Sequence, residues 1–174
     1  MKISHKLPQF ENSPALFITS GEYEAEFYLA LDGTLERKVK IKMPPREEAK
    51  EKQAFVGVKS GRFGLAAVSH RGAYIEDLKR KFQKKVHGVI HDLLAQYKMK
   101  EIYLFSPRYS AKRIMDGLDK SERKKVRMEF FDEYIKVSPL KMIEIFWKTE
   151  QEAVKPKVTL KDEEKKILKK PKIR

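Results

Sequence analysis

The sequence has no cysteine among its 174 residues, which excludes disulfide bonds, thiolate metal sites and cysteine nucleophiles. It also has no apolar run near the roughly 20 residues that a membrane-spanning helix needs. The first ten residues hold scattered apolar side chains and Pro8, which is not the pattern of a signal peptide. We therefore expect a soluble, cytoplasmic protein without a membrane partner.

Motifs of common enzyme classes are missing as well. The sequence has no G-x-S-x-G nucleophile motif. It also has no G-x-x-x-x-G-K-S/T phosphate-binding loop. We accordingly expect a protein that is not an enzyme and that uses no cofactor.

Positive charge, in contrast, is in excess. Lys and Arg number 39 against 25 Asp and Glu, giving a formal net charge of +14. Residues 155–174 hold nine basic and three acidic residues, so the excess is densest there. A strongly basic chain is typical of proteins with an anionic partner, and RNA is the leading candidate.

The first half of the sequence predicts a three-stranded meander. Residues 15–19 form a short apolar run, and residues 23–31 and 35–43 alternate between apolar and polar side chains. Asp32-Gly33 is a turn dipeptide that tolerates positive φ, and Pro44-Pro45 ends the last strand. Residues 46–74, which contain several glycines, are expected to form a mobile basic loop with some β character.

Helices and strands alternate in the second half. A strand is expected over 102–105, a helix from a Ser110 cap to Leu118, a further turn capped by Asp119 or Ser121, and a strand over 126–131. Ser138-Pro139 has the capping side chain and the proline that start a last helix, with Leu140, Ile143, Phe146 and Trp147 on its apolar face. Before these elements, apolar residues recur at steps of three and four and predict a helix over 75–97: Ile75, Leu78, Phe82, Val86, Val89, Leu93 and Tyr97.

The order β-β-β-α-β-α-β-α predicts an α/β fold with a mixed sheet and helices packed on it. The first three strands would be antiparallel and the later ones parallel, a topology shared with ribonuclease H-like folds. A two-metal nuclease of that fold needs carboxylates on the first strand and near the fourth. Residues 15–20 and 102–106 contain none, so no metal site is expected there. We predict an N-terminal extension (1–13), one domain (14–153) and a basic, disordered tail (154–174).

Three segments carry a family resemblance: FQKKVHGVIHDLL at 82–94, IYLFSPR at 102–108 and KVSPLKMIEI at 136–145. With these segments the sequence resembles the middle domain of the archaeo-eukaryotic release-factor superfamily, which includes bacterial and archaeal release-factor-like and host-attachment proteins. The resemblance covers roughly residues 14–150. It implies a role in translation, with the ribosome, tRNA or rRNA as partner.

Release factors of this superfamily carry a Gly-Gly-Gln motif in the loop before the long helix. The corresponding region here is GVKSGRFG at 57–64, which has no Gly-Gly pair. The nearest glutamines are Gln53 and Gln83. Because the residue that would help to position water is missing, we do not expect peptide release.

Basic residues at the loop, at the start of the long helix and after the second buried strand are our candidates for binding phosphates. Phe63 lies among them and could stack on a base. The alternative is a solvated face of a lysine-rich protein. The predicted RNA contacts are Lys59, Arg62, Phe63, Arg71, Lys79, Arg80, Lys81, Arg108, Lys112 and Arg113.

His87 and His91 are one turn apart on the predicted long helix, which is a spacing used by metal ligands. Position 88 is Gly, however, where the HExxH motif requires Glu. We expect exposed or core-edge histidines and no metal.

Three functions are consistent with the sequence. The leading hypothesis is a non-catalytic, ribosome- or RNA-associated protein related to translation release and rescue factors. The second is a protein-interaction or assembly module, in which a protein partner or a second copy binds an apolar surface of Phe131, Phe146 and Trp147. The alternative interpretation is that these side chains pack in the core. The third is a divergent peptidyl-tRNA hydrolase.

Overall fold

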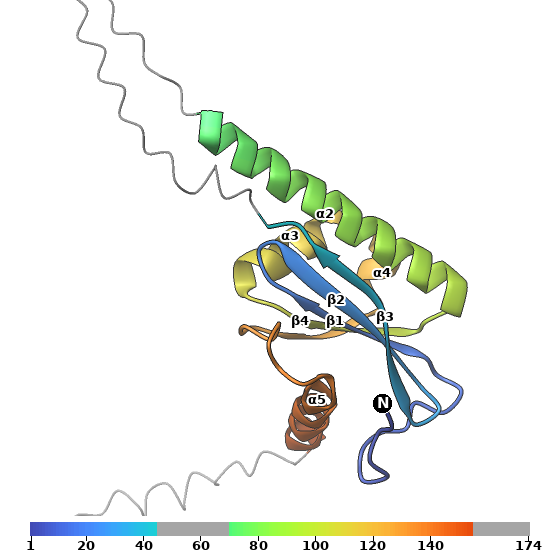
Figure 1. The fold of residues 1–174 in the computed structure, drawn as a ribbon. Coiled ribbons are helices and arrows are strands. Elements are labelled where there is room, and N and C mark those ends of the chain that lie inside the picture. Colours follow the sequence, from blue (N-terminus) through green and yellow to red (C-terminus); the bar gives the residue numbers. More distant parts are fainter. Residues whose placement is uncertain (45–69, 155–174) are drawn as a thin grey trace, which may run out of the picture.

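The computed structural model describes residues 1–44 and 70–154 (Figure 1). The strands are β1 (Ala15–Ser20), β2 (Glu24–Leu31), β3 (Thr34–Lys42), β4 (Glu101–Phe105) and β5 (Val126–Phe130). The helices are α2 (His70–Tyr97), α3 (Arg108–Gly117), α4 (Lys120–Arg123) and α5 (Pro139–Val154). Predictions for residues 45–69 and 155–174 lie outside the described part. Among the helices that are described, none has the length and hydropathy required to cross a bilayer.

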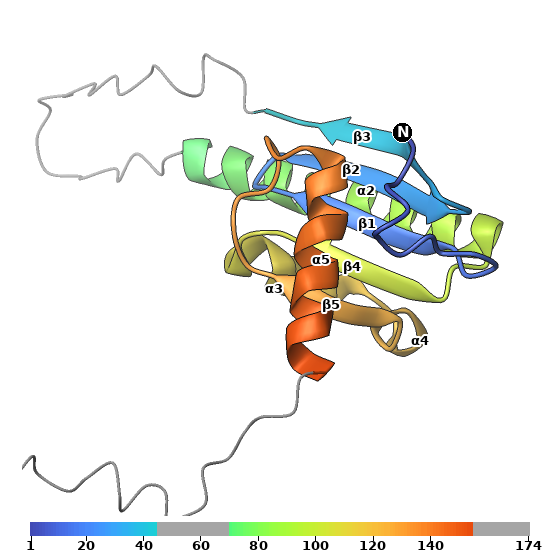
Figure 2. The same cartoon turned by 90° about the horizontal axis from the view of Figure 1, so that it is seen from below.

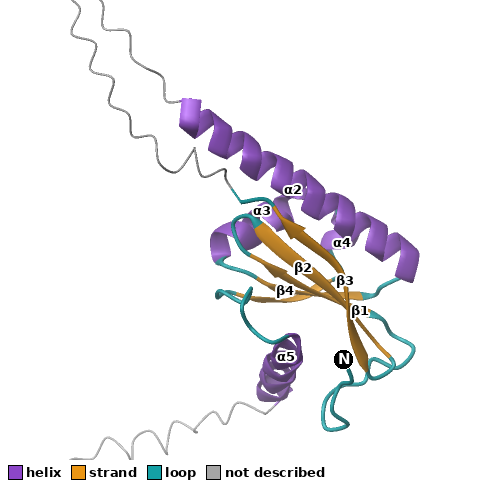
Figure 3. Ribbon diagram, in the orientation of Figure 1, coloured by secondary structure: helices purple, strands orange, loops and turns teal. Residues whose placement is uncertain are grey.

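The five strands form one sheet in the order β3-β2-β1-β4-β5. β1 pairs antiparallel with β2, and β2 antiparallel with β3. β4 runs parallel to β1 on its other side, and β5 parallel to β4. The predicted mixed sheet is therefore confirmed, and Figure 3 shows it with helices on both sides.

The first face of the sheet packs against α2 and α3 (Figure 1). Leu16 and Ile18 of β1 and Phe27 of β2 are at most 1% exposed there. They meet Val86 and Ile90 of α2, both fully buried. Side chains along a strand alternate between the two faces of the sheet, so every second residue of β1 and β2 lies on this face.

The second face packs against α5, which crosses the sheet in Figure 2. Aromatic rings dominate this core: Phe17 stacks on Tyr103 at 4.8 Å between ring centroids, and Tyr103 meets Phe146 at 4.3 Å. Both faces of β1 are thus covered, which explains why all six of its residues are buried and why it reads as a continuous apolar run.

The buried faces of α2 and α5 differ slightly from the predicted ones. Ile90 and Leu94 of α2 are buried, whereas Val89 is only half-buried. On α5, Met142 is buried and Trp147 is half-buried. Each stripe is rotated by about one position, because the angle at which a helix crosses the sheet selects among neighbouring apolar residues.

Two predicted helix starts were wrong. α2 begins at His70, not Ile75; one glycine costs a helix only about 1 kcal/mol, so the helix runs through Gly72. α3 begins at Arg108, with Pro107 rather than Ser110 at the cap. The Pro107 carbonyl accepts the Ser110 N–H at 3.0 Å, which places Ser110 inside the first turn. Of the two predicted caps of α4, Asp119 and not Ser121 occupies the N-cap position.

The predicted N-terminal extension packs against the domain. Ile3 is 4% exposed, and its N–H donates to the Gly33 carbonyl at 2.7 Å. Phe10 contacts Phe17 edge-on, with 5.6 Å between the ring centroids. Residues of this segment therefore complete the core under α5.

A buried carboxylate lies on the α5 face of β2. Glu26 is 7% exposed, accepts a hydrogen bond from the Tyr28 hydroxyl, and lies 2.7 Å from the Lys40 ammonium. Burial alone would raise the pKa of Glu26, but the hydrogen bonds from Lys40 and Tyr28 outweigh it and lower that pKa. Burial and the Glu26 carboxylate in turn raise the pKa of Tyr28 to about 12.

We expect Glu26→Gln to destabilise the fold by about 1–3 kcal/mol near pH 7. The pKa of Glu26 is lower in the folded protein than its ordinary value of 4.5. The stabilisation by its carboxylate is therefore fully present at pH values above 4.5, and it is lost as the pH falls through the pKa of the folded state. Urea unfolding at about pH 7 and about pH 3 should therefore give a smaller difference between wild type and variant in acid. The control Glu36→Gln, at an exposed ion pair with Lys38, should change stability by under about 0.5 kcal/mol. A pH-independent Glu26 effect would contradict the electrostatic account.

Two of the helical glycines offer a second test. A Cβ at Gly117 of α3 would lie 1.6 Å from Cε1 of His87, whose Nε2 contacts the Ile114 carbonyl at 3.0 Å. We expect Gly117→Ala to cost about 1–3 kcal/mol, measured as a lower Tm. A Cβ at Gly88 would have no neighbouring atom of the described part within 4 Å, apart from its chain neighbours and the backbone of its own helix. Gly88→Ala should therefore stabilise α2 by about 1 kcal/mol. Equal effects of the two would mean that α3 does not pack on α2 through this contact.

Candidate nucleic-acid interface

The carboxyl ends of the parallel strands β1, β4 and β5 meet at one edge of the sheet. Ser20 ends β1, and α3 begins at Arg108, three residues after β4 ends. Phe131 follows β5 directly. In open α/β sheets, ligands bind at this edge, so it is the leading candidate for a binding site.

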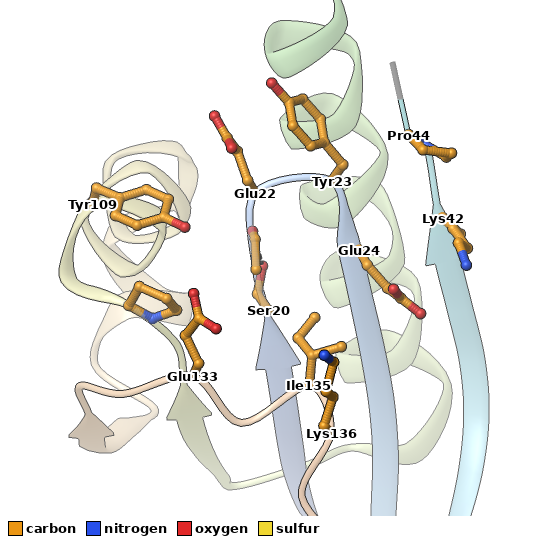
Figure 4. Close-up of a pocket in the computed structure, with 12 residues that line it drawn as sticks. Ser20, Glu22, Tyr23, Glu24, Lys42, Pro44, Tyr109, Glu133, Ile135 and Lys136 are labelled. Atoms are coloured by element: carbon orange, nitrogen blue, oxygen red, sulfur yellow. Dashed lines mark hydrogen bonds between the residues drawn. The ribbon is translucent and has the colours of Figure 1, made fainter. Parts of the chain in front are cut away.

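A cavity of about 300 Å³ opens at this edge (Figure 4). In the figure, Tyr109 and Glu133 stand on one side, Glu24 and Lys42 on the other, and Ile135 lies below. The full lining is Ser20, Gly21, Glu22, Tyr23, Glu24, Lys42, Pro44, Pro107, Tyr109, Glu133, Ile135 and Lys136. Three glutamates make this cavity unfavourable for a phosphate.

Tyr109, in the first turn of α3, is the side chain around which charges of both signs gather. It is 52% exposed. Partial burial raises the pKa of its hydroxyl, and the Glu22 and Glu133 carboxylates raise it further, while Lys79 and Arg113 act in the opposite direction. Residues from α2, α3 and the loops after β1 and β5 therefore converge on one aromatic ring.

Hydrogen bonds between β1 and α3 fix the start of α3. The Ser110 hydroxyl donates to the Gly21 carbonyl at 2.9 Å and lies 3.2 Å from the Ser20 hydroxyl. Ser20 and Ser110 are both at least nine-tenths buried. This contact holds the first turn of α3 against the end of β1.

The predicted contacts on α2 are ion-paired. The Lys79 ammonium lies 2.9 Å from the Glu22 carboxylate. Arg80 and Lys81 share Asp77, each at 2.7 Å. Much of the positive charge predicted at these three residues is therefore neutralised locally.

The predicted contacts on α3 are different. Arg108, Lys112 and Arg113 form no ion pair with any residue of the described part. Arg108 and Lys112 are exposed and Arg113 is half-exposed. The Arg108 guanidinium lies 5.2 Å from the centroid of the Phe131 ring. Among the predicted contacts whose side chains are described, these three cations are therefore the ones without an ion pair.

The structure brings some predicted residues together and not others. Lys79 and Arg113 line one narrow groove between α2 and α3. Arg108 and Lys112 line a different groove, between α3 and β5. Arg71 belongs to the first turn of α2; its side chain, like Lys59, Arg62 and Phe63, lies outside the described part.

Two exposed aromatic side chains at this edge, Tyr109 and Phe131, were absent from the predicted RNA contacts. Phe131 had instead been grouped with Phe146 and Trp147 as an apolar partner surface. Phe146 is 2% exposed within the core, so those three side chains do not form one exposed surface. The sequence feature that indicates Tyr109 is its position next to the predicted contact Arg108, in the segment Ser-Pro-Arg-Tyr at 106–109.

His87 and His91 are held by other groups. His87 contacts the Ile114 carbonyl, and Nδ1 of His91 lies 3.0 Å from the Glu122 carboxylate. Both histidines thus join α2 to α3 and α4. Among the described residues, no cluster of His, Asp and Glu has the geometry to bind a metal.

Solved structures match this fold. The archaeal translation termination factor aRF1 superposes with a TM-score of 0.50 at 17% sequence identity, over 82% of this chain and 40% of that one. A second structure, described only as an archaeal protein, gives a TM-score of 0.44 at 12% identity, over 82% of this chain and 39% of that one. No protein-family model and no curated protein matches the sequence. The likeness to aRF1 shows a release-factor-like domain fold, and this chain spans less than half of that protein.

We expect Ser110→Ala to destabilise the protein by about 1–2 kcal/mol, because the buried Ser20 hydroxyl loses a partner and the start of α3 loses its tie to Gly21. Denaturant unfolding measures the change. The exposed Ser121→Ala is the control and should stay within about 0.5 kcal/mol of wild type. A neutral Ser110→Ala would show that the contact does not anchor α3.

Proposed function

We propose that the protein is a non-catalytic, RNA-associated protein of the cytoplasm that acts on the ribosome. It contacts RNA through the α3 surface, which consists of Arg108, Lys112 and Arg113. The observation that carries the proposal is the set of unpaired cations on α3, at the ligand-binding edge of a fold similar to that of a translation termination factor.

Electrostatics support an RNA partner. The chain carries a formal net charge of +14, which attracts polyanions and speeds their association. Cations that neutralise phosphates release counterions, which gives salt-dependent binding. Of the predicted contacts, Lys79, Arg80 and Lys81 on α2 are ion-paired within the protein, whereas those on α3 are not.

The non-catalytic part of the proposal rests on missing groups. Residues 57–64 have no Gly-Gly-Gln motif, and β1 has no carboxylate. Glu101, the acid of β4, lies at the opposite end of that strand, where it accepts from Tyr103 at 2.7 Å and pairs with Arg127. A divergent peptidyl-tRNA hydrolase remains the alternative, and an ester-release assay with no turnover above buffer would exclude it.

The test is co-sedimentation of the full chain with ribosomes over a range of salt concentrations. We expect Lys112→Glu/Arg113→Glu to weaken binding at least about tenfold at low salt. The slope of log K against log salt should fall by about 2, since each lost phosphate contact reduces it by about 1.

The matched control is Lys141→Glu/Lys148→Glu, with the same charge change at two exposed lysines of α5, on the other face of the sheet. It should retain most of the binding. Equal losses in both double variants would show generic charge attraction and contradict the α3 surface. No sedimentation of wild type at any salt concentration would contradict the ribosomal role.

A further inference from the structure

A groove of about 470 Å³ lies between α3 and β5, lined by Arg108, Lys112, Met115, Glu129 and Phe131. Its floor is mostly apolar, and its rim carries two cations and one acid. We infer that this groove binds one unpaired nucleotide of a single-stranded RNA, with the base stacked on Phe131 and its phosphate held by Arg108 and Lys112. This inference rests on the proposed function and adds the kind of RNA and the place where it binds.

Phe131 is exposed on a well-anchored backbone. Its neighbour Phe130 stacks on the buried ring of Phe105, with 4.4 Å between centroids and 10° between planes. Phe131 follows the strand and lines the groove with residues of α3, and it is 49% exposed. In the described part only Met1, Tyr109 and Phe131 are large apolar side chains with this exposure. An exposed aromatic ring is what base stacking requires.

Arg108 already contacts the Phe131 ring. Its guanidinium lies 5.2 Å from the ring centroid, within the range of a cation–π interaction. A guanidinium plane and an aromatic ring can both stack on a base, and arginine also binds phosphate. Arg108 can therefore cover the base or turn to the phosphate without leaving the groove.

Charge sets the orientation of the nucleotide. Arg108 and Lys112 are one helical turn apart on α3, so they lie on the same side of the groove. Glu129, an exposed residue of β5, repels a phosphate and accepts hydrogen bonds from amino groups of bases. The phosphate thus lies along α3 and the base edge towards β5. The cavity of about 300 Å³ lined by Glu22, Glu24 and Glu133 lacks this polarity.

The inference predicts a difference between single strands and duplexes. We would measure fluorescence anisotropy of labelled oligouridylate and oligocytidylate of about ten nucleotides, and of a blunt-ended RNA duplex, with the full chain. Phe131→Ala should weaken binding of the single strands about tenfold and leave binding of the duplex within about twofold. Phe131→Trp should retain single-strand binding, and its added indole fluorescence should be quenched by the strand.

Tyr109→Ala is the matched control, because Tyr109 has similar exposure and lies on the other side of α3. It should change single-strand binding less than about twofold. Equal losses in the two alanine variants, or an unchanged Phe131→Ala, would overturn the groove assignment. Displacement of the strand by an equal concentration of free UMP would overturn the assignment to an RNA strand.

The two proposals fail separately. Loss of ribosome binding in Lys112→Glu/Arg113→Glu together with an unchanged Phe131→Ala would refute the stacked base and leave the ribosomal role intact. A tenfold loss in Phe131→Ala without ribosome binding by wild type would support the nucleotide groove and refute the ribosomal role. Capture of a protein on this groove in competition with the strand would also overturn the assignment.

Discussion

Everything else in this fold depends on the burial of β1. All six residues of the strand are buried, with Leu16 and Ile18 in the core under α2 and α3 and Phe17 in the core under α5. Such burial is possible only if both edges of β1 are hydrogen-bonded, by β2 on one side and β4 on the other. The carboxyl end of this central strand is therefore fixed relative to the first turn of α3, and the groove and cavity at that edge are built on it.

The position of acidic partners decides which cations are available at that edge. On α2, Asp77 precedes Lys81 by four residues, which is the favourable order along a helix dipole, and the pair forms. On α3, Asp116 follows Lys112 by four residues, the less favourable order, and the described part contains no such pair. The order of acid and base along each helix thus decides whether the pair forms.

The element order and the mixed sheet could be predicted because they depend on local periodicity. The alternation over 35–43 and the helical spacing from Phe82 onward arise within a few residues, and both elements are present in the structure. What could not be predicted depends on contacts between distant residues. Ser110 is predicted to cap α3, but its hydroxyl donates to the carbonyl of Gly21, which is 89 residues away in the sequence. Likewise, no local pattern indicates that Lys79 pairs with Glu22 or that Arg108 covers Phe131.

The strand order also has a consequence for biosynthesis. β1, β2 and β3 are adjacent in sequence and can pair as soon as they leave the ribosome, but β4 begins about eighty residues after β1 ends. At 5–20 residues per second, translation of this interval takes roughly 4–16 s. Throughout this interval, the largely apolar strand β1 has an unpaired edge, which is an aggregation hazard. The nascent chain is therefore exposed to aggregation for a defined period, which ends only when β4 pairs with β1.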